Sequence, residues 1–378
     1  MMKVANVGGS NSVLKASYTN IIPSKYGIAI NNKGIGATNS IYALINIIKY
    51  DLIKQNDLLI FEYFVNDNNH YFQGINNVER ICKTLAEIVN MCIKWKTKLL
   101  FVLIYNKNHQ LENKYETSPV YQLYKNIIEK YRIPSIDMYD VLYSKFNDKW
   151  HEYYQDKTHL SHEGHMVLSE EIVNKIKDHE NQLKYLSHAD GKLLNYNNNH
   201  DDDNNNNNNR VKGFNSVNVL EIAKYATQNS INNISNSLIN LNYVTIDDAV
   251  DIEFDQNTEI LAIEYICDAE SGYIEVDGSG KKCNLKKVNV IQKNTLKKEK
   301  FVLEKMKKMA SLITFNSTIF APSNKYTIKI IDAKELDANV YDREKHTLED
   351  DSKRKQLSSF KLVSLLVTNK ARIKRIFQ

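Results

Sequence analysis

The residues whose types and spacing best suit catalysis are Asp156 and His159, which lie three positions apart in the sequence Asp-Lys-Thr-His. A spacing of three places two side chains on nearly the same side of a helical turn, where a carboxylate can hydrogen-bond an imidazole. A carboxylate that orients an imidazole needs only a nucleophile to form a catalytic triad. The pair therefore predicts a nucleophile supplied by another segment of the chain.

Ser10 is the best candidate for that nucleophile. It follows the short apolar run at residues 3–7 and two glycines, Gly8 and Gly9, which permit a sharp turn. Taken alone, a serine after two glycines is more often just a turn. Ser12 is a rival nucleophile two positions later, but it is better explained as a cap of the following segment.

The composition is that of an ordinary soluble protein with two domains. The chain has 378 residues, of which 42% are hydrophobic and 25% are charged. The formal net charge of +5 is small for this length, so it does not indicate a nucleic-acid partner. No apolar run approaches the ~20 residues of a membrane span, and we expect no integral membrane segment.

The four cysteines show no metal-ligand spacing. Cys82 and Cys92 are expected on one helix, where ten residues correspond to roughly 15 Å, too far for a disulfide. A reduced cytoplasmic protein is the simplest interpretation. A first strand that begins by Lys3 agrees with it, because it leaves no room for a signal peptide.

Three histidines, His159, His162 and His165, also invite interpretation as metal ligands. Their positions drift around a helix, and no ligand cluster elsewhere in the sequence supports a metal site. His165 lies beside Gly164 and is better explained by packing or capping. We therefore expect neither a metal nor another cofactor.

Strands and helices alternate through the first half of the chain. The expected strands are residues 3–7, 27–31, 58–65, 99–105 and 135–138, and the expected helices are residues 39–54, 76–96, 121–131 and 161–177. The run at 58–65 is almost wholly apolar, as expected of a strand covered on both faces. The alternation predicts a parallel sheet between two layers of helices.

Small and polar residues follow the predicted strands. Ser10 follows the first strand, Gly36 follows the second, and Asn66 with Asp67 follows the third. Because ligands bind at the carboxyl ends of parallel strands, these residues are expected at one edge of the sheet. The segment before the last helix brings His159 and its acid to the same edge.

These blocks resemble those of the SGNH hydrolases, also called GDSL-like esterases, and they occur in the family's order. They are Gly-Gly-Ser-Asn-Ser at Ser10, Gly-Ile-Gly-Ala-Thr at Gly36, Val-Asn-Asp at Asn66, and Asp-Lys-Thr-His from Asp156 to His159. The resemblance covers roughly residues 3–180 and implies a three-layer, flavodoxin-like α/β/α domain. Two positions depart from the family pattern, since Gly9 replaces an aspartate and Phe64 replaces a glycine.

The resemblance also implies a role for each matching residue. Ser10 would attack an ester carbonyl, with His159 as general base. Asp156 would orient and stabilise the imidazolium. The backbone N–H groups of Ser10 and Gly36 and the side-chain amide of Asn66 would form the oxyanion hole.

Aromatic residues are frequent near the last block. Trp150, Tyr153 and Tyr154 lie in a polar segment just before Asp156. Exposed aromatic rings stack well on sugars or acyl chains. We therefore expect these three rings to form a wall of the substrate site.

The composition changes after the first half. We expect a catalytic domain at residues 1–185, an Asn- and Asp-rich linker at 186–212, and a β-rich accessory domain at 213–378. The expected strands of this last domain are residues 250–254, 260–266, 273–276, 312–320, 326–331 and 360–367, with a basic helix at 295–309. This pattern predicts an antiparallel β-sandwich, which could make peripheral or protein contacts, for example through the basic tail at 370–375.

The resemblance favours a serine esterase that hydrolyses O-acyl esters, O-acetyl esters above all, on a carbohydrate or polysaccharide through an acyl-serine intermediate. The first alternative is an O-acetyltransferase, because the same intermediate can pass its acyl group to a sugar hydroxyl during surface-polysaccharide synthesis. The second is a glycan-binding or scaffold protein that has lost its activity. The departures at Gly9 and Phe64 support this second alternative.

Overall fold

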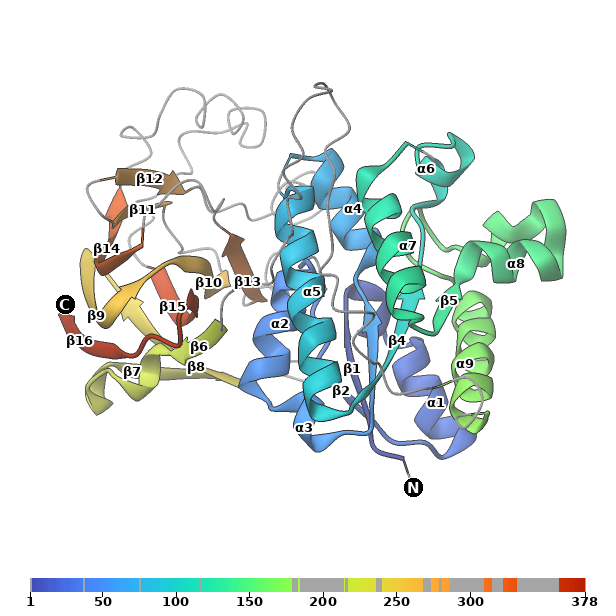
Figure 1. Ribbon diagram of the computed structural model, residues 1–378, viewed down its shortest axis with the longest axis horizontal. Helices are drawn as coiled ribbons and strands as arrows, with labels where there is room; N and C mark the ends of the chain where they lie inside the picture. Colours follow the sequence, from blue (N-terminus) through green and yellow to red (C-terminus); the bar gives the residue numbers. More distant parts are fainter. Residues whose placement is uncertain are drawn as a thin grey trace, which may run out of the picture. The chain divides into compact units, whose positions relative to one another are not determined.

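The computed structural model describes residues 2–36, 38–74, 76–115, 117–178, 183, 214, 217–235, 240–267, 273–278, 281–285, 309–314, 322–331 and 360–377. The chain divides into two compact units, Met1–Phe214 and Asn215–Gln378 (Figure 1). Each unit is described by itself. The expected linker at residues 186–212 lies outside the described residues, so the finer domain boundaries stay a prediction.

The first unit alternates strands and helices. Its strands are β1 (Val4–Gly8), β2 (Ile30–Asn32), β3 (Leu58–Glu62), β4 (Lys98–Leu103) and β5 (Ser135–Asp137). Its helices are α1 (Tyr18–Tyr26), α2 (Ser40–Lys49), α3 (Leu52–Gln55), α4 (Phe64–Phe72), α5 (Val78–Trp95), α6 (Lys107–Leu111), α7 (Pro119–Tyr131), α8 (Met138–Phe146) and α9 (His162–Lys177). Two 3-10 segments, η1 (Ser10–Ser12) and η2 (Asn147–Tyr153), complete it.

All neighbouring strands of this unit pair in parallel, in the order β2-β1-β3-β4-β5. The chain leaves β1 toward β2 on one side and returns to β3 on the other side. The order of the strands therefore reverses at β1, and such a switch point is where open α/β sheets bind ligands, at the carboxyl ends of the strands. Ser10 lies at this end of β1, with only Gly9 between them.

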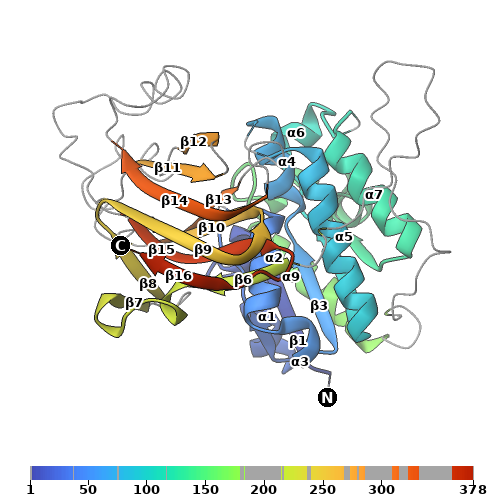
Figure 2. The ribbon, with the colours of Figure 1, turned by 60° about the vertical axis from the view of Figure 1, so that its left-hand side comes forward.

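Helices cover both faces of the sheet, with α1 and α9 on one face and α2 and α5 on the other (Figures 1 and 2). Strand β3 shows why both faces must be apolar. Leu58 and Ile60 pack with residues of α1 and α9, whereas Phe61 points to the other face and contacts the Phe101 ring. The predicted three-layer α/β/α class with a parallel sheet is confirmed.

Two expected elements are shorter than predicted. The helix expected at 39–54 is interrupted because Asp51 adopts a left-handed conformation with φ of 49°, which aspartate tolerates better than most residues. The strand expected at 58–65 ends at Glu62, and helix α4 begins at Phe64. Asn66 therefore lies in the first turn of a helix and not in a loop.

The second unit is built of antiparallel strands. They are β6 (Val217–Glu221), β7 (Ile231–Ser235), β8 (Asn240–Ile246), β9 (Ala249–Thr258), β10 (Ile260–Cys267), β11 (Tyr273–Gly278), β12 (Lys281–Leu285), β13 (Met309–Thr314), β14 (Ser323–Ile331), β15 (Phe360–Thr368) and β16 (Ile373–Phe377). One sheet has the order β13-β10-β15-β8-β7, with β6 also paired to β15. The other has the order β12-β11-β14-β9-β16.

The two sheets share one hydrophobic core. Ile252 and Phe254 of β9 belong to the same buried cluster as Tyr265 of β10 and Leu365 of β15, although β9 lies in a different sheet from the other two. The expected β-sandwich is thereby confirmed.

The helix expected at 295–309 lies outside the described residues except at Met309, which begins β13. Part of the basic tail forms the edge strand β16, where Lys374 Nζ lies 3.1 Å from Glu253 Oε1.

The hydrophobic core of the first unit can be tested at strand β4. Leu100 of β4 is fully buried, and we expect Leu100→Ala to lower the free energy of unfolding by about 2–5 kcal/mol because it leaves a cavity. Urea unfolding followed by tryptophan fluorescence reports on this unit alone, because both tryptophans, Trp95 and Trp150, lie in it. Leu111→Ala is the matched control, since Leu111 is 60% exposed. Equal losses in the two variants would contradict the assignment of Leu100 to the core.

Candidate active site

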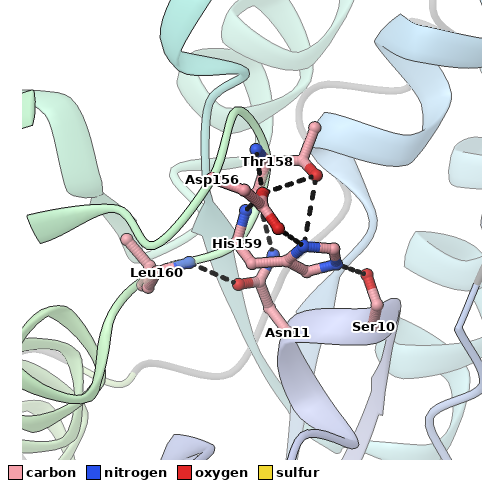
Figure 3. A network of polar contacts seen from close by, with 6 residues as sticks. All are labelled: Ser10, Asn11, Asp156, Thr158, His159 and Leu160. Carbon is pink, nitrogen blue, oxygen red and sulfur yellow. Dashed lines mark hydrogen bonds and ion pairs between the residues drawn. The ribbon is translucent and has the colours of Figure 1, made fainter.

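The structure brings Ser10, His159 and Asp156 into one hydrogen-bonded line (Figure 3). Ser10 Oγ lies 2.6 Å from His159 Nε2, and His159 Nδ1 lies 2.6 Å from Asp156 Oδ2. An ionised carboxylate only accepts hydrogen bonds, so it places the imidazole proton on Nδ1. Nε2 is then free to accept the proton of the serine hydroxyl. This geometry would let Ser10 act as a nucleophile, His159 as a general base and Asp156 as an orienting acid.

The carboxylate of Asp156 is fixed by its own loop. Its Oδ1 accepts the backbone N–H groups of Thr158 and His159, each at 2.8 Å. Partial burial opposes ionisation of Asp156, but the hydrogen bonds from Thr158 and His159 outweigh it, so the pKa of Asp156 lies below its ordinary value. The group therefore stays charged at neutral pH, as an acid that orients an imidazole must.

The turn that carries Ser10 is anchored from strand β3. The backbone N–H of Gly9 donates to the backbone oxygen of Glu62 at 3.0 Å and to its carboxyl Oε2 at 3.1 Å. A Cβ atom on Gly9 would lie 2.5 Å from Asn66 Oδ1, so the Asn66 side chain occupies the space that a side chain at position 9 would need. Glu62 thus anchors the turn although position 9 carries no aspartate, and the Asn66 side chain fills the space beside Gly9.

Glu62 was not anticipated as a site residue, although a single acid within an apolar run was a signal that could have identified it. Its side chain is fully buried, and burial raises its pKa to about 8, against the smaller opposing effect of the Gly9 hydrogen bond. Its Oε1 atom has no hydrogen-bond partner among the described residues. Glu62 is therefore predominantly protonated at neutral pH, directly below the nucleophile turn.

The expected oxyanion donors lie close to the turn of Gly9 and Ser10. A Cβ atom on Gly36 would lie 3.4 Å from Ser10 Cβ, so the Gly36 backbone approaches the serine closely. Among the described residues, no acceptor takes the backbone N–H of either Ser10 or Gly36. Asn66 Nδ2 donates one of its two protons to the Thr38 backbone oxygen at 2.7 Å, which leaves the second proton for another acceptor.

A partly buried amide network supports the turn that carries Ser10. Asn32 Oδ1 accepts from Asn6 Nδ2 at 2.8 Å and from the Gly34 backbone N–H at 2.9 Å. Asn32 Nδ2 donates to the Ser12 backbone oxygen at 2.7 Å. One side chain thus ties the segment after β1 to the segment after β2, which leads to Gly36. Nothing in the sequence distinguished Asn32 from the many other asparagines of the chain.

Ser12 and Asp67 have structural roles. Ser12 Oγ donates to the Gly9 backbone oxygen at 2.8 Å and is buried. Asp67 accepts the Ser40 backbone N–H at the start of α2 and the Tyr124 hydroxyl at 2.7 Å. Burial raises the pKa of Asp67 to about 6 despite these hydrogen bonds. Neither side chain is hydrogen-bonded to the Ser10–His159–Asp156 line.

The aromatic residues before Asp156 are not an exposed wall. Trp150 and Tyr154 are each 5% exposed and belong to the core on the α9 side of the sheet, so the expectation of exposed rings is wrong for both. Tyr153 is partly buried and stacks on Phe146 with the ring centroids 4.0 Å apart. Contacts with the rings of the preceding helix α8, such as Tyr139 against Trp150, outweigh the polar local sequence on which the expectation was based.

Phe64 also lies in the core. Its ring is fully buried and packs edge-to-face or stacked against the rings of Tyr105, Tyr115, Tyr121 and Tyr124. The departure from glycine at this position therefore adds an aromatic core residue at the start of α4. It does not place a bulky ring beside Ser10 on the solvent side.

Three further observations concern metal ligands, cysteines and membrane spans. Within the described ranges, no group of three or more His, Cys, Asp or Glu residues could hold a metal ion. Cys82 and Cys92 are free and buried on α5, as predicted from their spacing. No helix in the described part of the chain is both long enough and apolar enough to cross a membrane.

The buried acid below the nucleophile turn predicts a pH dependence of stability. Between pH 4.5 and about 8 the unfolded chain loses the Glu62 proton while the folded chain keeps it, so a rise in pH favours unfolding. We expect the free energy of unfolding to fall by ~1.4 kcal/mol per pH unit from this group, and Glu62→Gln to remove that contribution. Urea unfolding at several pH values in this window measures it. If the free energy of unfolding changed with pH in the same way for the wild type and for Glu62→Gln, Glu62 would not be buried in its protonated form.

The chain shares its fold with solved esterase structures, although no protein-family model and no curated protein matches it. A two-domain esterase active on acetylated mannans is 14% identical, with a TM-score of 0.53 over 98% of this chain and 92% of that chain. The structure of such an esterase co-crystallised with mannopentaose gives a TM-score of 0.55 at the same identity and coverage. An acetylxylan esterase from Geobacillus stearothermophilus covers 46% of this chain at 16% identity, with a TM-score of 0.38.

The likeness to the two-domain esterase extends the description of the fold. The parallel sheet with flanking helices and the antiparallel sheets that follow it match the fold of the two-domain esterase over nearly the whole of both chains. The resemblance drawn from the four sequence blocks is confirmed at the level of the fold. The whole chain therefore has the fold of a two-domain esterase.

Proposed function

We propose that this chain is a serine esterase that hydrolyses O-acetyl esters on a carbohydrate through an acyl-serine intermediate. The observation that carries the proposal is the line from Ser10 through His159 to Asp156, with both hydrogen bonds at 2.6 Å. The line lies at the carboxyl end of β1, where the order of the strands reverses. A structural serine in a turn would need neither an oriented imidazole nor backbone N–H groups without acceptors nearby.

The proposed reaction begins with attack of Ser10 Oγ on the ester carbonyl carbon while His159 Nε2 takes the hydroxyl proton. The tetrahedral intermediate collapses when its bond to the sugar oxygen breaks, and His159 returns the proton to that oxygen. A water molecule then attacks the acyl-serine and gives a proton to His159. The Oγ–acyl bond breaks, Ser10 regains its proton, and acetate is released. Asp156 stabilises the imidazolium in both halves.

The developing negative charge would be met by donors that the fold already holds in place. The backbone N–H groups of Ser10 and Gly36 and the second proton of the Asn66 amide are the candidates. Fixed donors stabilise an oxyanion without reorganisation during the reaction, and one such donor is typically worth ~3 kcal/mol in the barrier. Asn66 is 9% exposed, so little water competes for its amide.

The choice of a carbohydrate acetyl ester rests on the full-length likeness. The two-domain esterase whose fold spans nearly all of both chains is described as active on acetylated mannans. The present chain combines the same two-domain fold with hydrogen bonds that join Ser10, His159 and Asp156. Two observations favour activity over the inactive-protein alternative: Glu62 anchors the turn at Gly9, and the Phe64 ring is buried in the core.

Hydrolysis of p-nitrophenyl acetate and release of acetate from acetylated mannan test the proposal. We expect the wild-type protein to hydrolyse both substrates and Ser10→Ala to lose at least ~10³-fold in kcat, since the acyl-serine cannot form. Loss of the Ser10 hydroxyl leaves its backbone N–H in place, so binding should change little. Equal rates for the two proteins would disprove a serine mechanism. Acetyl transfer to added mannose in preference to water would identify a transferase instead.

The oxyanion role of Asn66 has a separate test. We expect Asn66→Ala to lower kcat by about 10²–10³-fold with little change in KM, because the amide would act mainly on the charge of the transition state. Steady-state kinetics with p-nitrophenyl acetate measures both constants. Asn56→Ala is the matched control, since the Asn56 amide likewise donates to one backbone oxygen, that of Leu52, just before β3 begins. A kcat of Asn66→Ala within twofold of the control would exclude Asn66 as a donor.

A further inference from the structure

The side chain of Asn11 connects the two segments that carry Ser10 and His159. Asn11 Nδ2 donates to the Thr158 backbone oxygen at 2.9 Å, and Asn11 Oδ1 accepts the Leu160 backbone N–H at 3.0 Å. The bonded residues are 147 and 149 positions away in the sequence. Asn11 itself is fully buried. Both polar atoms of its amide are therefore used, and both contact the same short segment.

The two bonds flank His159 and leave its ring untouched (Figure 3). A carboxamide has a donor and an acceptor in one plane, as a peptide group has. The Asn11 side chain therefore pairs with the carbonyl before His159 and the N–H after it, in the way that a neighbouring strand would. Such a pair fixes the height and the tilt of the intervening residue, here the catalytic candidate His159.

Few other polar contacts join these segments. Within the described ranges, the recorded hydrogen bonds between the turn at 9–13 and the segment at 155–160 are the two of Asn11 and the Ser10–His159 bond itself. The other hydrogen bonds of the segment at 155–160 are internal or come from other elements. For example, the Lys107 backbone N–H donates to the Lys157 backbone oxygen at 2.7 Å. Apart from the Ser10–His159 bond, Asn11 therefore makes both hydrogen bonds that join the described parts of these two segments directly.

We propose that Asn11 is a positioning residue that holds the His159–Asp156 pair at hydrogen-bonding distance from Ser10. The inference rests on the proposed serine mechanism and deepens it. Formation of the His159–Asp156 pair and its placement beside Ser10 are assigned to different residues. The pair is built within its own loop, because Asp156 accepts the backbone N–H of His159 and contacts the ring. Asn11 sets only where that preformed pair lies relative to the nucleophile.

Two variants and one control test this division. Asn11→Ala removes both bonds, whereas Asn11→Asp keeps the shape and the acceptor for Leu160 but loses the donor to Thr158. Asn56→Ala again serves as the control. Three quantities are measured on the full chain: kcat and KM for p-nitrophenyl acetate, the rate of Ser10 labelling by a fluorophosphonate, and the NMR signal of the His159 Nδ1 proton, assigned by its absence in His159→Ala.

We expect kcat and the labelling rate of Asn11→Ala to fall by about 10²-fold with KM within twofold, because a shift of about 1 Å in reacting groups has an effect of this size. Asn11→Asp should lose about tenfold or more. The Nδ1 proton signal should persist in both variants, since the His159–Asp156 bond does not involve Asn11. A purely structural role would lower the melting temperature and leave kcat of the folded fraction unchanged.

Three results would overturn the inference, and they differ from one another. Wild-type rates in Asn11→Asp and in the folded fraction of Asn11→Ala would show that Asn11 does not position the pair. Loss of both the Nδ1 proton signal and Ser10 labelling in the Asn11 variants would show that Asn11 is needed to form the loop, and not only to position it. A wild-type protein without Ser10 labelling or esterase activity would remove the proposed function itself, and this inference with it.

Discussion

The site depends on one constraint: a hydroxyl and an imidazole that are 149 positions apart in the chain must stay within a hydrogen bond of each other. Flexible loops alone would lose considerable conformational entropy in meeting it. The fold meets it with rigid elements, since the turn after β1 is bonded to β3 at Glu62 and the loop before α9 is bonded to the start of α6 at Lys157. The geometry is thus prepared before any substrate binds.

The elements that hold the site in place bury several polar side chains, and their burial costs free energy. Glu62, Asn6 and Asn11 are all fully buried, and a buried polar group is costly unless it is hydrogen-bonded. The amides of Asn6 and Asn11 have partners, but one carboxyl oxygen of Glu62 has none among the described residues. The apolar strands β3 and β4, covered on both faces, supply the stability that offsets such local costs.

The sequence predicted what depends on local pattern. Glycines after an apolar run located the nucleophile turn at Ser10, and the spacing of Asp156 and His159 anticipated their contact. What the sequence could not show depends on tertiary packing. Trp150 lies in a polar stretch yet is buried, with its ring against those of Tyr139 and Tyr154. A single acid in an apolar run marks Glu62 in the sequence, but its partner Gly9, 53 positions away, could not be predicted. The Asn-rich strands β7 and β8 lacked the apolar contrast that reveals a strand.

The close approach of Gly9 and Asn66 has an evolutionary consequence. Any side chain at position 9 would collide with the Asn66 amide, because its Cβ atom would lie 2.5 Å from Asn66 Oδ1. The two positions therefore cannot vary independently. An acid at position 9 would require a smaller or differently oriented side chain at position 66, and so would change the amide that donates to the Thr38 backbone oxygen.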